Sequence, residues 1–229
     1  MNKLTKLFIM LVCCTAATTL TSCLNSDDDN GGLNPETEKV VRSNMAGTYG
    51  GTKIFFYNDT ITDKKNTNKI DSICSSLNTF RVNATDSTIV LSEVPGRLIS
   101  KAFNALQYPT ETSKELAAAL EKAPAQPLTC KFAIYGVNDA GYAGAYVAPY
   151  AIKYPNITFG DKTHTVYVTF FNPSTLGYLN KKMAITVCVQ SIYLDDEQSA
   201  AYTFYGGNAS TSDKAANLAS FQIYGERIY

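Results

Sequence analysis

Residues 128–138 read LTCKFAIYGVN, and apolar and polar side chains alternate along them. Leu128, Cys130, Phe132 and Ile134 share one side of an extended chain, because successive side chains of a β-strand point to opposite faces. This alternation is typical of a strand that packs one face on a core and exposes the other. The segment therefore predicts a β-strand, with Cys130 turned toward the core.

The same signature recurs along the chain, bounded by Gly, Asn, Asp and Pro. Gly50 and Gly51, inside the first of these strands, predict a bulge or a close main-chain approach. The other predicted strands cover residues 48–57, 77–82, 88–94, 150–160, 164–173, 182–194, 200–208 and 219–229.

Three segments have helical spacing instead. Residues 35–45 start with a proline and early acids, which suit a first helical turn. Residues 98–106 and 112–123 carry Leu and Ala at helical spacing, and Thr112 or Ser113 is the expected cap of the second. Strands, a helical insert and more strands predict a β-rich α+β fold. We expect a mainly antiparallel sheet, either a sandwich or a partly closed barrel, with two or three short helices.

The first 22 residues have the layout of a secretory signal peptide. Lys3 and Lys6 precede an apolar stretch that starts at Leu7, and small residues end it before Cys23. The apolar core is too short to span a bilayer stably. We therefore expect residues 1–22 to be removed.

Leu20-Thr21-Ser22-Cys23 resembles a bacterial lipobox. The resemblance implies that the Cys23 thiol is diacylated, that the chain is cut before it, and that the new amine is acylated. Acyl chains add about 0.8 kcal/mol per buried CH₂, so such a cysteine is a lasting membrane anchor.

An acidic run follows, formed by Ser26, Asp27, Asp28 and Asp29. It resembles the lipoprotein export signal of Bacteroidetes, which implies an outer-membrane lipoprotein exposed at the cell surface. A solvated spacer is the compatible alternative, since Asn30-Gly31-Gly32 favours a flexible tether. Residues 23–34 are thus the expected lipidated tether, and residues 35–229 a single β-rich domain.

Composition excludes one class of partner. Removing residues 1–22 takes two lysines from a chain with 20 basic and 20 acidic residues, which leaves a net charge of about −2. Nucleic-acid binding needs a basic surface, so no nucleic acid is expected.

Motifs for catalysis or metal binding are missing from the sequence. It has no Gly-x-Ser-x-Gly elbow, phosphate-binding glycine loop, His-Glu-x-x-His or Cys-x-x-Cys, and His164 is the sole histidine. Residues 195–197, Asp-Asp-Glu, favour a solvated turn over a cation site. An odd number of cysteines with no framework spacing favours free thiols over a disulfide at Cys74, Cys130 and Cys188. We therefore predict no catalytic residue, metal or cofactor.

Four tyrosines recur every four residues, at Tyr142, Tyr146, Tyr150 and Tyr154. Gly144 argues against a continuous helix that would align them. One interpretation is rings packed on the sheet, and the other is an aromatic platform for a sugar or peptide, because tyrosine serves both cores and interfaces.

Three Asp-Ser/Thr pairs resemble the acceptor for O-glycosylation of exported Bacteroides proteins. The implied acceptors are Thr60, Ser72 and Ser87. The same dipeptides also form turns.

A wider resemblance rests on MAGTYGG (45–51), DSTIVLSEVPGRLIS (86–100) and LTCKFAIYG (128–136). This pattern resembles an uncharacterised family of Bacteroidales surface lipoproteins, known as a domain of unknown function. The family implies no activity and no catalytic residues. MAGTYGG is also loosely similar to the first-strand Gly-x-Trp motif of calycins, with Tyr49 in place of the tryptophan, which implies a lipocalin-type barrel.

These observations predict a surface lipoprotein that acts as a non-catalytic binding or scaffold module, for a glycan or peptide, with an outer-membrane protein as a candidate partner. Two alternatives remain open: a surface hydrolase that uses carboxylates, and a lipocalin-like carrier of a small apolar ligand.

Overall fold

The computed structural model describes residues 33–59, 71–74, 79–101, 103, 110–195, 203–206 and 218–229. Its helices are α2 (Pro35–Met45), α3 (Gly96–Ser100) and α4 (Glu111–Glu121). Its strands are β1 (Gly47–Asp59), β2 (Asp71–Cys74), β3 (Phe80–Asn83), β4 (Thr88–Val94), β5 (Gln126–Val137), β6 (Ala143–Pro149), β7 (Ile152–Phe159), β8 (Lys162–Phe170), β9 (Ser174–Leu179), β10 (Lys182–Leu194), β11 (Thr203–Gly206) and β12 (Leu218–Arg227).

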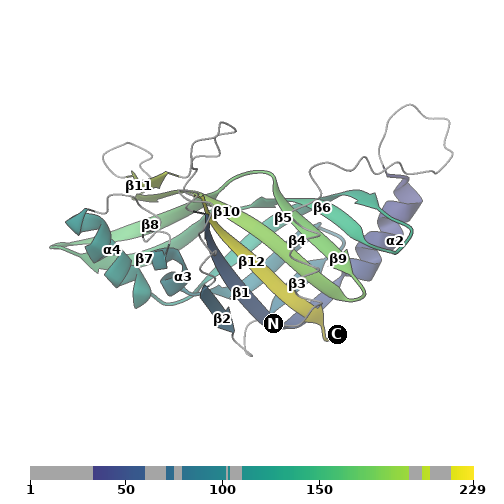
Figure 1. The fold of residues 1–229 in the computed structure, drawn as a ribbon, viewed down its shortest axis with the longest axis horizontal. Coiled ribbons are helices and arrows are strands. Elements are labelled where there is room, and N and C mark those ends of the chain that lie inside the picture. Colours follow the sequence, from purple (N-terminus) through teal and green to yellow (C-terminus); the bar gives the residue numbers. More distant parts are fainter. Residues whose placement is uncertain are drawn as a thin grey trace.

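Eight strands form a closed antiparallel barrel (Figure 1). Their order is β12-β1-β3-β4-β5-β6-β9-β10, and β10 pairs back with β12 to close the ring. The predicted β-rich antiparallel fold with a few short helices is therefore confirmed, and the barrel is the observed form rather than the sandwich. Closure leaves these eight strands without the exposed edges that an open sheet would have.

Strand β10 belongs to two sheets. Its first half pairs with β9 and β12, and its second half pairs with β8 and β11. The register shifts between Val189 and Ser191, where the strand leaves the barrel. A smaller sheet, β7-β8-β10-β11, thus extends from one end of the barrel (Figure 1).

Strand β5 alternates as expected. Leu128, Cys130, Phe132 and Ile134 are buried, whereas Lys131 and the other odd positions face outward. Because it is buried, the Cys130 thiol has its pKa raised to about 12, so it behaves as an apolar core group. Neither Cys130 nor Cys188 is in a disulfide, and the side chain of Cys74 lies outside the described residues.

The predicted irregularity in the first strand is present. The register of β1 against β12 shifts between Gly50 and Lys53, and Gly51 has φ of 63°. That left-handed conformation favours glycine, which explains a glycine at the bulge.

The sequence prediction missed three strands, namely β2, β6 and β9. β6 consists largely of Ala and Gly with one tyrosine, and Gly177 interrupts the apolar pattern of the six-residue β9. Small residues carry little periodic signal, so alternation could not reveal β6, and β9 is short, with only Leu176 and Tyr178 as large inward side chains.

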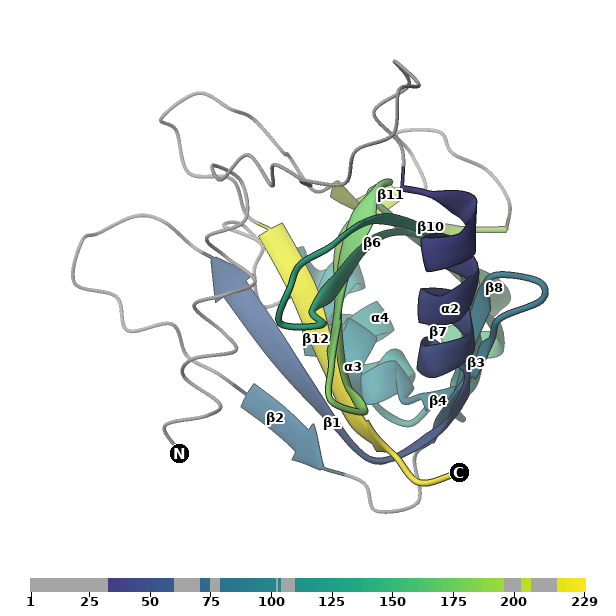
Figure 2. The ribbon, with the colours of Figure 1, turned by 90° about the vertical axis from the view of Figure 1, so that its right-hand side faces the viewer.

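Helix α2 lies across one end of the barrel (Figure 2). Its Val41 and Met45 are buried in the core. The Tyr178 hydroxyl donates to the Asn44 carbonyl at 2.8 Å, and the Tyr49 hydroxyl donates to the Met45 carbonyl at 2.7 Å. These two donated hydrogen bonds fix the last turn of α2 to β9 and β1, and they give the buried tyrosine hydroxyls the partners they need.

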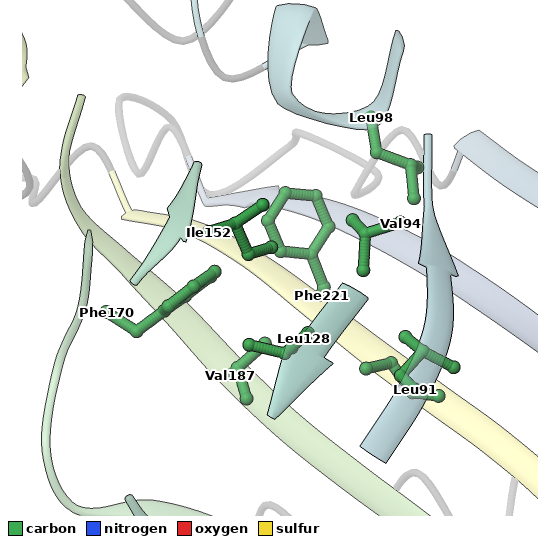
Figure 3. Close-up of a pocket in the computed structure, with 9 residues that line it drawn as sticks. Leu91, Val94, Leu98, Leu128, Ile152, Phe170, Val187 and Phe221 are labelled. Carbon is green, nitrogen blue, oxygen red and sulfur yellow. The ribbon is translucent and has the colours of Figure 1, made fainter. Parts of the chain in front are cut away.

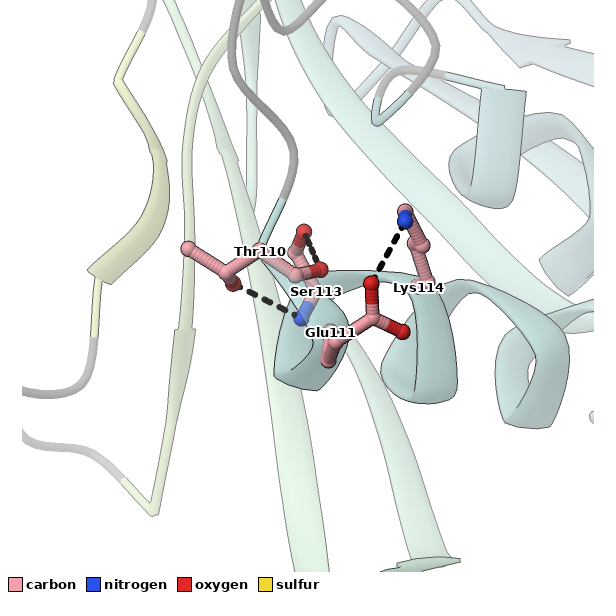
Figure 4. Close-up of polar contacts among 4 residues, drawn as sticks. All are labelled: Thr110, Glu111, Ser113 and Lys114. Carbon is pink, nitrogen blue, oxygen red and sulfur yellow. Dashed lines mark hydrogen bonds and ion pairs between the residues drawn. The ribbon is translucent and has the colours of Figure 1, made fainter.

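Helices α3 and α4 lie at the other end of the barrel (Figure 1). The expected cap of α4 was wrong, because the helix begins at Glu111 and Thr110 caps it. The Thr110 hydroxyl accepts the Ser113 N–H at 3.1 Å, and the Ser113 hydroxyl donates back to the Thr110 carbonyl at 2.8 Å (Figure 4). Ser113 is thus a partner of the cap rather than the cap itself.

The described side chains that point into the barrel form one continuous apolar core. A cavity of about 10 Å³ remains, roughly the space of one water, and nine apolar residues surround it (Figure 3). Phe221 lies in the middle of this group in Figure 3. A lipocalin-like carrier needs a hollow barrel, and this cavity is too small to hold a ligand.

Candidate binding face

The structure separates the four tyrosines that the sequence grouped. Tyr154 is fully buried, and its hydroxyl donates to the Val94 carbonyl at 2.9 Å. Burial raises its pKa well above the ordinary tyrosine value. Tyr154 is therefore a core residue that cannot contact a ligand, whereas Tyr146 and Tyr150 are about half exposed, at 50% and 52%.

Tyr135 joins Tyr142 and Tyr146 on the outer face of the barrel. The rings of Tyr135 and Tyr146 lie 4.7 Å apart between centroids, tilted by 43°. Burial raises the pKa of Tyr135, and the neighbouring Tyr146 raises it further. Burial and then Tyr135 raise the pKa of Tyr142 in the same way. The three phenols are thus close neighbours, and we call Tyr142, Tyr135 and Tyr146 the tyrosine row.

Two glycines leave the space that two rings of this row occupy. Gly144 of β6 and Gly177 of β9 are cross-strand partners. A Cβ at Gly144 would lie 2.5 Å from the Tyr135 Cζ, and one at Gly177 would lie 2.6 Å from the Tyr142 Oη. The rings of Tyr135 and Tyr142 therefore pack directly on the glycines of the sheet, in the space that a larger side chain would fill. Aromatic residues commonly cover strand glycines in this way.

Next to the row on the outer face lie Ala133 and Lys131 of β5. Ala133 of β5 lies opposite Tyr146, and Lys131, two residues earlier on the same outward side, donates from Nζ to the Asp86 carbonyl at 2.8 Å. Tyr135 is 36% exposed and Tyr142 only 9%, so the accessible part of the row centres on Tyr135 and Tyr146.

Sequence reasoning missed Tyr135 because nothing in its spacing links it to the other three. Its place beside the other tyrosines could have been inferred from the β5–β6 hairpin. Once Ala133 is paired with Tyr146, Tyr135 falls beside Gly144 on the same outward face.

His164 has a partner that the sequence did not reveal. Its Nδ1 lies 2.6 Å from Oδ2 of Asp195, and the Asp195 Oδ1 accepts the Thr165 N–H at 2.9 Å. Asp195 also donates its own N–H to the Thr165 carbonyl, and its φ of 54° places it in a turn. The carboxylate therefore connects the end of β10 to the start of β8. The expected turn begins at Asp195, and Asp196 and Glu197 lie outside the described residues.

Hydrogen bonds from His164 and from the Thr165 N–H lower the pKa of Asp195. A carboxyl whose pKa is lowered by folding stabilises the fold above the ordinary carboxyl pKa and loses that contribution as the pH falls through the folded value.

We therefore expect Asp195→Asn to destabilise the domain near pH 7 by less than about 1 kcal/mol, since the carboxylate is largely exposed. The difference from the parent chain should shrink toward pH 3. Urea unfolding of both chains at the two pH values measures it. An equal difference at both values would mean that the charge of Asp195 contributes nothing.

Other predicted sites fall in different places. Cys23 and the run from Ser26 to Asp29 lie outside the described residues, as does Thr60, and nothing is described of the Ser72 side chain in β2. Ser87 has φ of 51° in the turn between β3 and β4. It is half-buried, and its carbonyl accepts the Phe132 N–H at 2.9 Å, so the turn interpretation holds for this pair whether or not the hydroxyl is modified.

Two further features of the described residues bear on function. Among them, no group of three or more His, Cys, Asp or Glu side chains is arranged to hold a metal ion. None of the helices in that part of the chain combines the length and the apolar character needed to cross a membrane.

Comparison with known proteins identifies a family but no function. Neither a curated protein nor a solved structure matches the chain. A family model described as a domain of unknown function, DUF4840, matches residues 44–194, from the end of α2 to the end of β10. The expected membership of an uncharacterised family is confirmed, and the Bacteroidales source stays a prediction. Because the match covers most of the sequence, the chain belongs to the DUF4840 family.

Proposed function

We propose that this protein is a lipid-anchored, non-catalytic binding module of the cell surface, and that its tyrosine row binds a glycan or an extended peptide. The observation that carries the proposal is the row itself, with Tyr135 and Tyr146 in ring contact on the outer face of the barrel. Tyrosine offers a large rigid contact area with few rotatable bonds, together with a polar hydroxyl.

The row is preorganised by the sheet beneath it. Tyr135 and Tyr142 rest on Gly144 and Gly177, and Tyr135 also contacts Tyr146. These rings are already held in place, so a ligand that stacks on them would restrict their motion only a little further. Preorganisation of this kind improves affinity because ordering side chains on binding costs about 0.5–1.5 kcal/mol each.

The hydrolase alternative gains less support. Carboxylate-only hydrolysis needs two acids facing each other across one cleft. A broad groove between α4 and the β7–β8 hairpin has a single acid, Glu115, among its lining residues. The anchor and the surface location rest on the sequence, through Cys23 and the acidic run that follows it.

Tyr146→Ala should weaken glycan or peptide retention about tenfold or more, because a central aromatic contact is often worth more than 1.4 kcal/mol. Tyr150→Ala is the matched control, since Tyr150 is equally exposed but makes no ring contact with the row in the described structure. Retention is measured on immobilised host and plant glycans and on peptide arrays, with product release scored in parallel.

Gly144→Ala gives a second variant that keeps all three tyrosines. Its Cβ would displace the Tyr135 ring, and retention should fall without loss of folding. Equal retention by the parent chain, Tyr146→Ala and Gly144→Ala would refute the tyrosine row as the contact surface. Sugar release abolished by changing one Asp or Glu would establish the hydrolase instead.

A further inference from the structure

A second surface feature lies away from the tyrosine row. It is a groove of about 500 Å³ between α4 and β7, which lie side by side at the left of Figure 1. This volume is within the range of small-ligand sites. We call it the edge groove, and its lining residues are Glu115, Ala118, Ala119, Lys122, Ala123, Pro124, Asn156, Ile157, Thr158, Phe159 and Gly160.

One wall of the edge groove is formed by the edge of β7. Residues 156–159 of β7 and Gly160 of the following turn line it consecutively. Successive side chains of a strand point to opposite faces, so neighbouring residues that all line one groove present the edge of the strand, main chain included, to it. Strand β7 is also the terminal strand of its sheet in the described part of the chain, with β8 on its other side.

The hairpin register shows which main-chain groups face the groove. Phe159 pairs with Lys162 across the two-residue turn Gly160-Asp161, and the pair that closes such a turn exchanges hydrogen bonds. The next pair, Thr158 with Thr163, is then a non-hydrogen-bonded pair. Its side chains approach closely, with the two Oγ1 atoms 2.8 Å apart. The N–H and C=O of Thr158 therefore point away from β8, toward the open edge.

The other wall is one face of α4. Glu115, Ala118, Ala119 and Lys122 are spaced at i, i+3, i+4 and i+7, so they form one stripe. The alanines leave room, and the two charged residues stand at opposite ends of the stripe. Seven residues of helix separate them by about 10 Å, which an extended chain covers in about three residues.

Main-chain groups along one wall and opposite charges at the ends of the other suit a peptide better than a small apolar molecule. We propose that the edge groove binds an extended peptide segment of a partner protein, which pairs with β7 at Thr158. A basic side chain of the peptide faces Glu115, and an acidic one faces Lys122. Pro155 and the bulge between Tyr154 and Ile157 limit this pairing to the end of β7 near the hairpin.

The test uses the purified ¹⁵N-labelled full chain and the peptide acetyl-TKVTVEV-amide. Its Lys and Glu are four residues apart, the shortest same-face spacing that spans about 10 Å. The Thr158 amide signal should shift and saturate during the titration. The same peptide with proline at its central position, which cannot donate there, should bind more weakly.

Ala118→Phe should weaken peptide binding at least tenfold, because the exposed Ala118 lines the groove and a phenyl ring there fills it. Thr112→Phe is the matched control, on an exposed position of α4 outside the groove, and should bind as the parent chain does. Tyr146→Ala should also bind normally, since this inference does not rest on the tyrosine row.

Three results would overturn the inference. The Thr158 amide could stay unmoved at millimolar peptide, or Ala118→Phe could bind as tightly as the control. A shift caused by octanoate and not by the peptide would assign the groove to a small apolar molecule instead.

Discussion

Phe221→Ala is expected to lower the free energy of unfolding by about 3–5 kcal/mol, the usual range for removing a buried phenylalanine ring. Phe221 is 3% exposed and borders the small interior cavity (Figure 3). It lies on β12, the strand that pairs with both β1 and β10 and so closes the barrel. A void at this point joins the existing cavity, and the barrel strands around it can collapse only a little without losing their registers.

The whole stability of a domain is about 5–15 kcal/mol, so this one change removes a large part of it. Urea unfolding followed by far-ultraviolet circular dichroism measures the loss. Tyr229→Ala is the matched control, because Tyr229 follows the same strand but its side chain is 87% exposed. The control should stay within about 0.5 kcal/mol of the parent chain. A loss below about 1 kcal/mol for Phe221→Ala would mean that the interior is not packed as described.

Alternating burial made much of the barrel predictable. The β5 pattern of Leu128, Cys130, Phe132 and Ile134 carries its own evidence of a strand, because each buried side chain is large enough to stand out from its neighbours. Strand β6, one of those that escaped prediction, fills its inward positions differently. Ala143 and Ala145 of β6 are fully buried yet small, so they give almost no hydropathy contrast. Their role appears only once β5 and β9 are placed on either side.

The tyrosine site was predictable in part. Tyr142 and Tyr146 share a face because an even spacing preserves the side of a strand. The same argument fails for Tyr154. Tyr150 follows the end of β6, and β7 restarts with Ile152 facing inward, so Tyr154 also turns into the core. After a turn, the next strand can start with either face inward. Spacing in the sequence therefore does not show which face a tyrosine beyond the turn will occupy.

Sequence spacing could not predict contacts between residues of different strands. His164 and Asp195 are 31 residues apart and meet because β8 and β10 are antiparallel neighbours, with Val166 opposite Leu194. Thr158 likewise gains its outward main-chain groups from the β7–β8 register. In both cases the sequence supplies the residue types, and the register brings them to their partners.

Cys23→Ser is expected to move the protein from the membrane fraction almost entirely into the soluble fraction. The acylated thiol is the proposed anchor, and several acyl chains at about 0.8 kcal/mol per CH₂ hold a protein far more firmly than a weakly charged surface can. Without residues 1–22 the chain has a net charge of about −2, so attraction to anionic lipids cannot replace the proposed anchor. Serine keeps the size of the side chain and lacks the thiol on which the lipid is built.

Carbonate-washed membranes and the medium are compared by immunoblot for the parent and variant chains. The matched control replaces Asp27, Asp28 and Asp29 with alanine and keeps Cys23. That chain should stay in the membrane fraction yet resist protease added to intact cells, because the acidic run is the proposed signal for exposure rather than for anchoring. Equal digestion of the control and the parent chain would reduce the three aspartates to a spacer. Cys23→Ser protein that remained with the washed membranes would show that another part of the chain holds it there, and the lipid anchor would have to be abandoned.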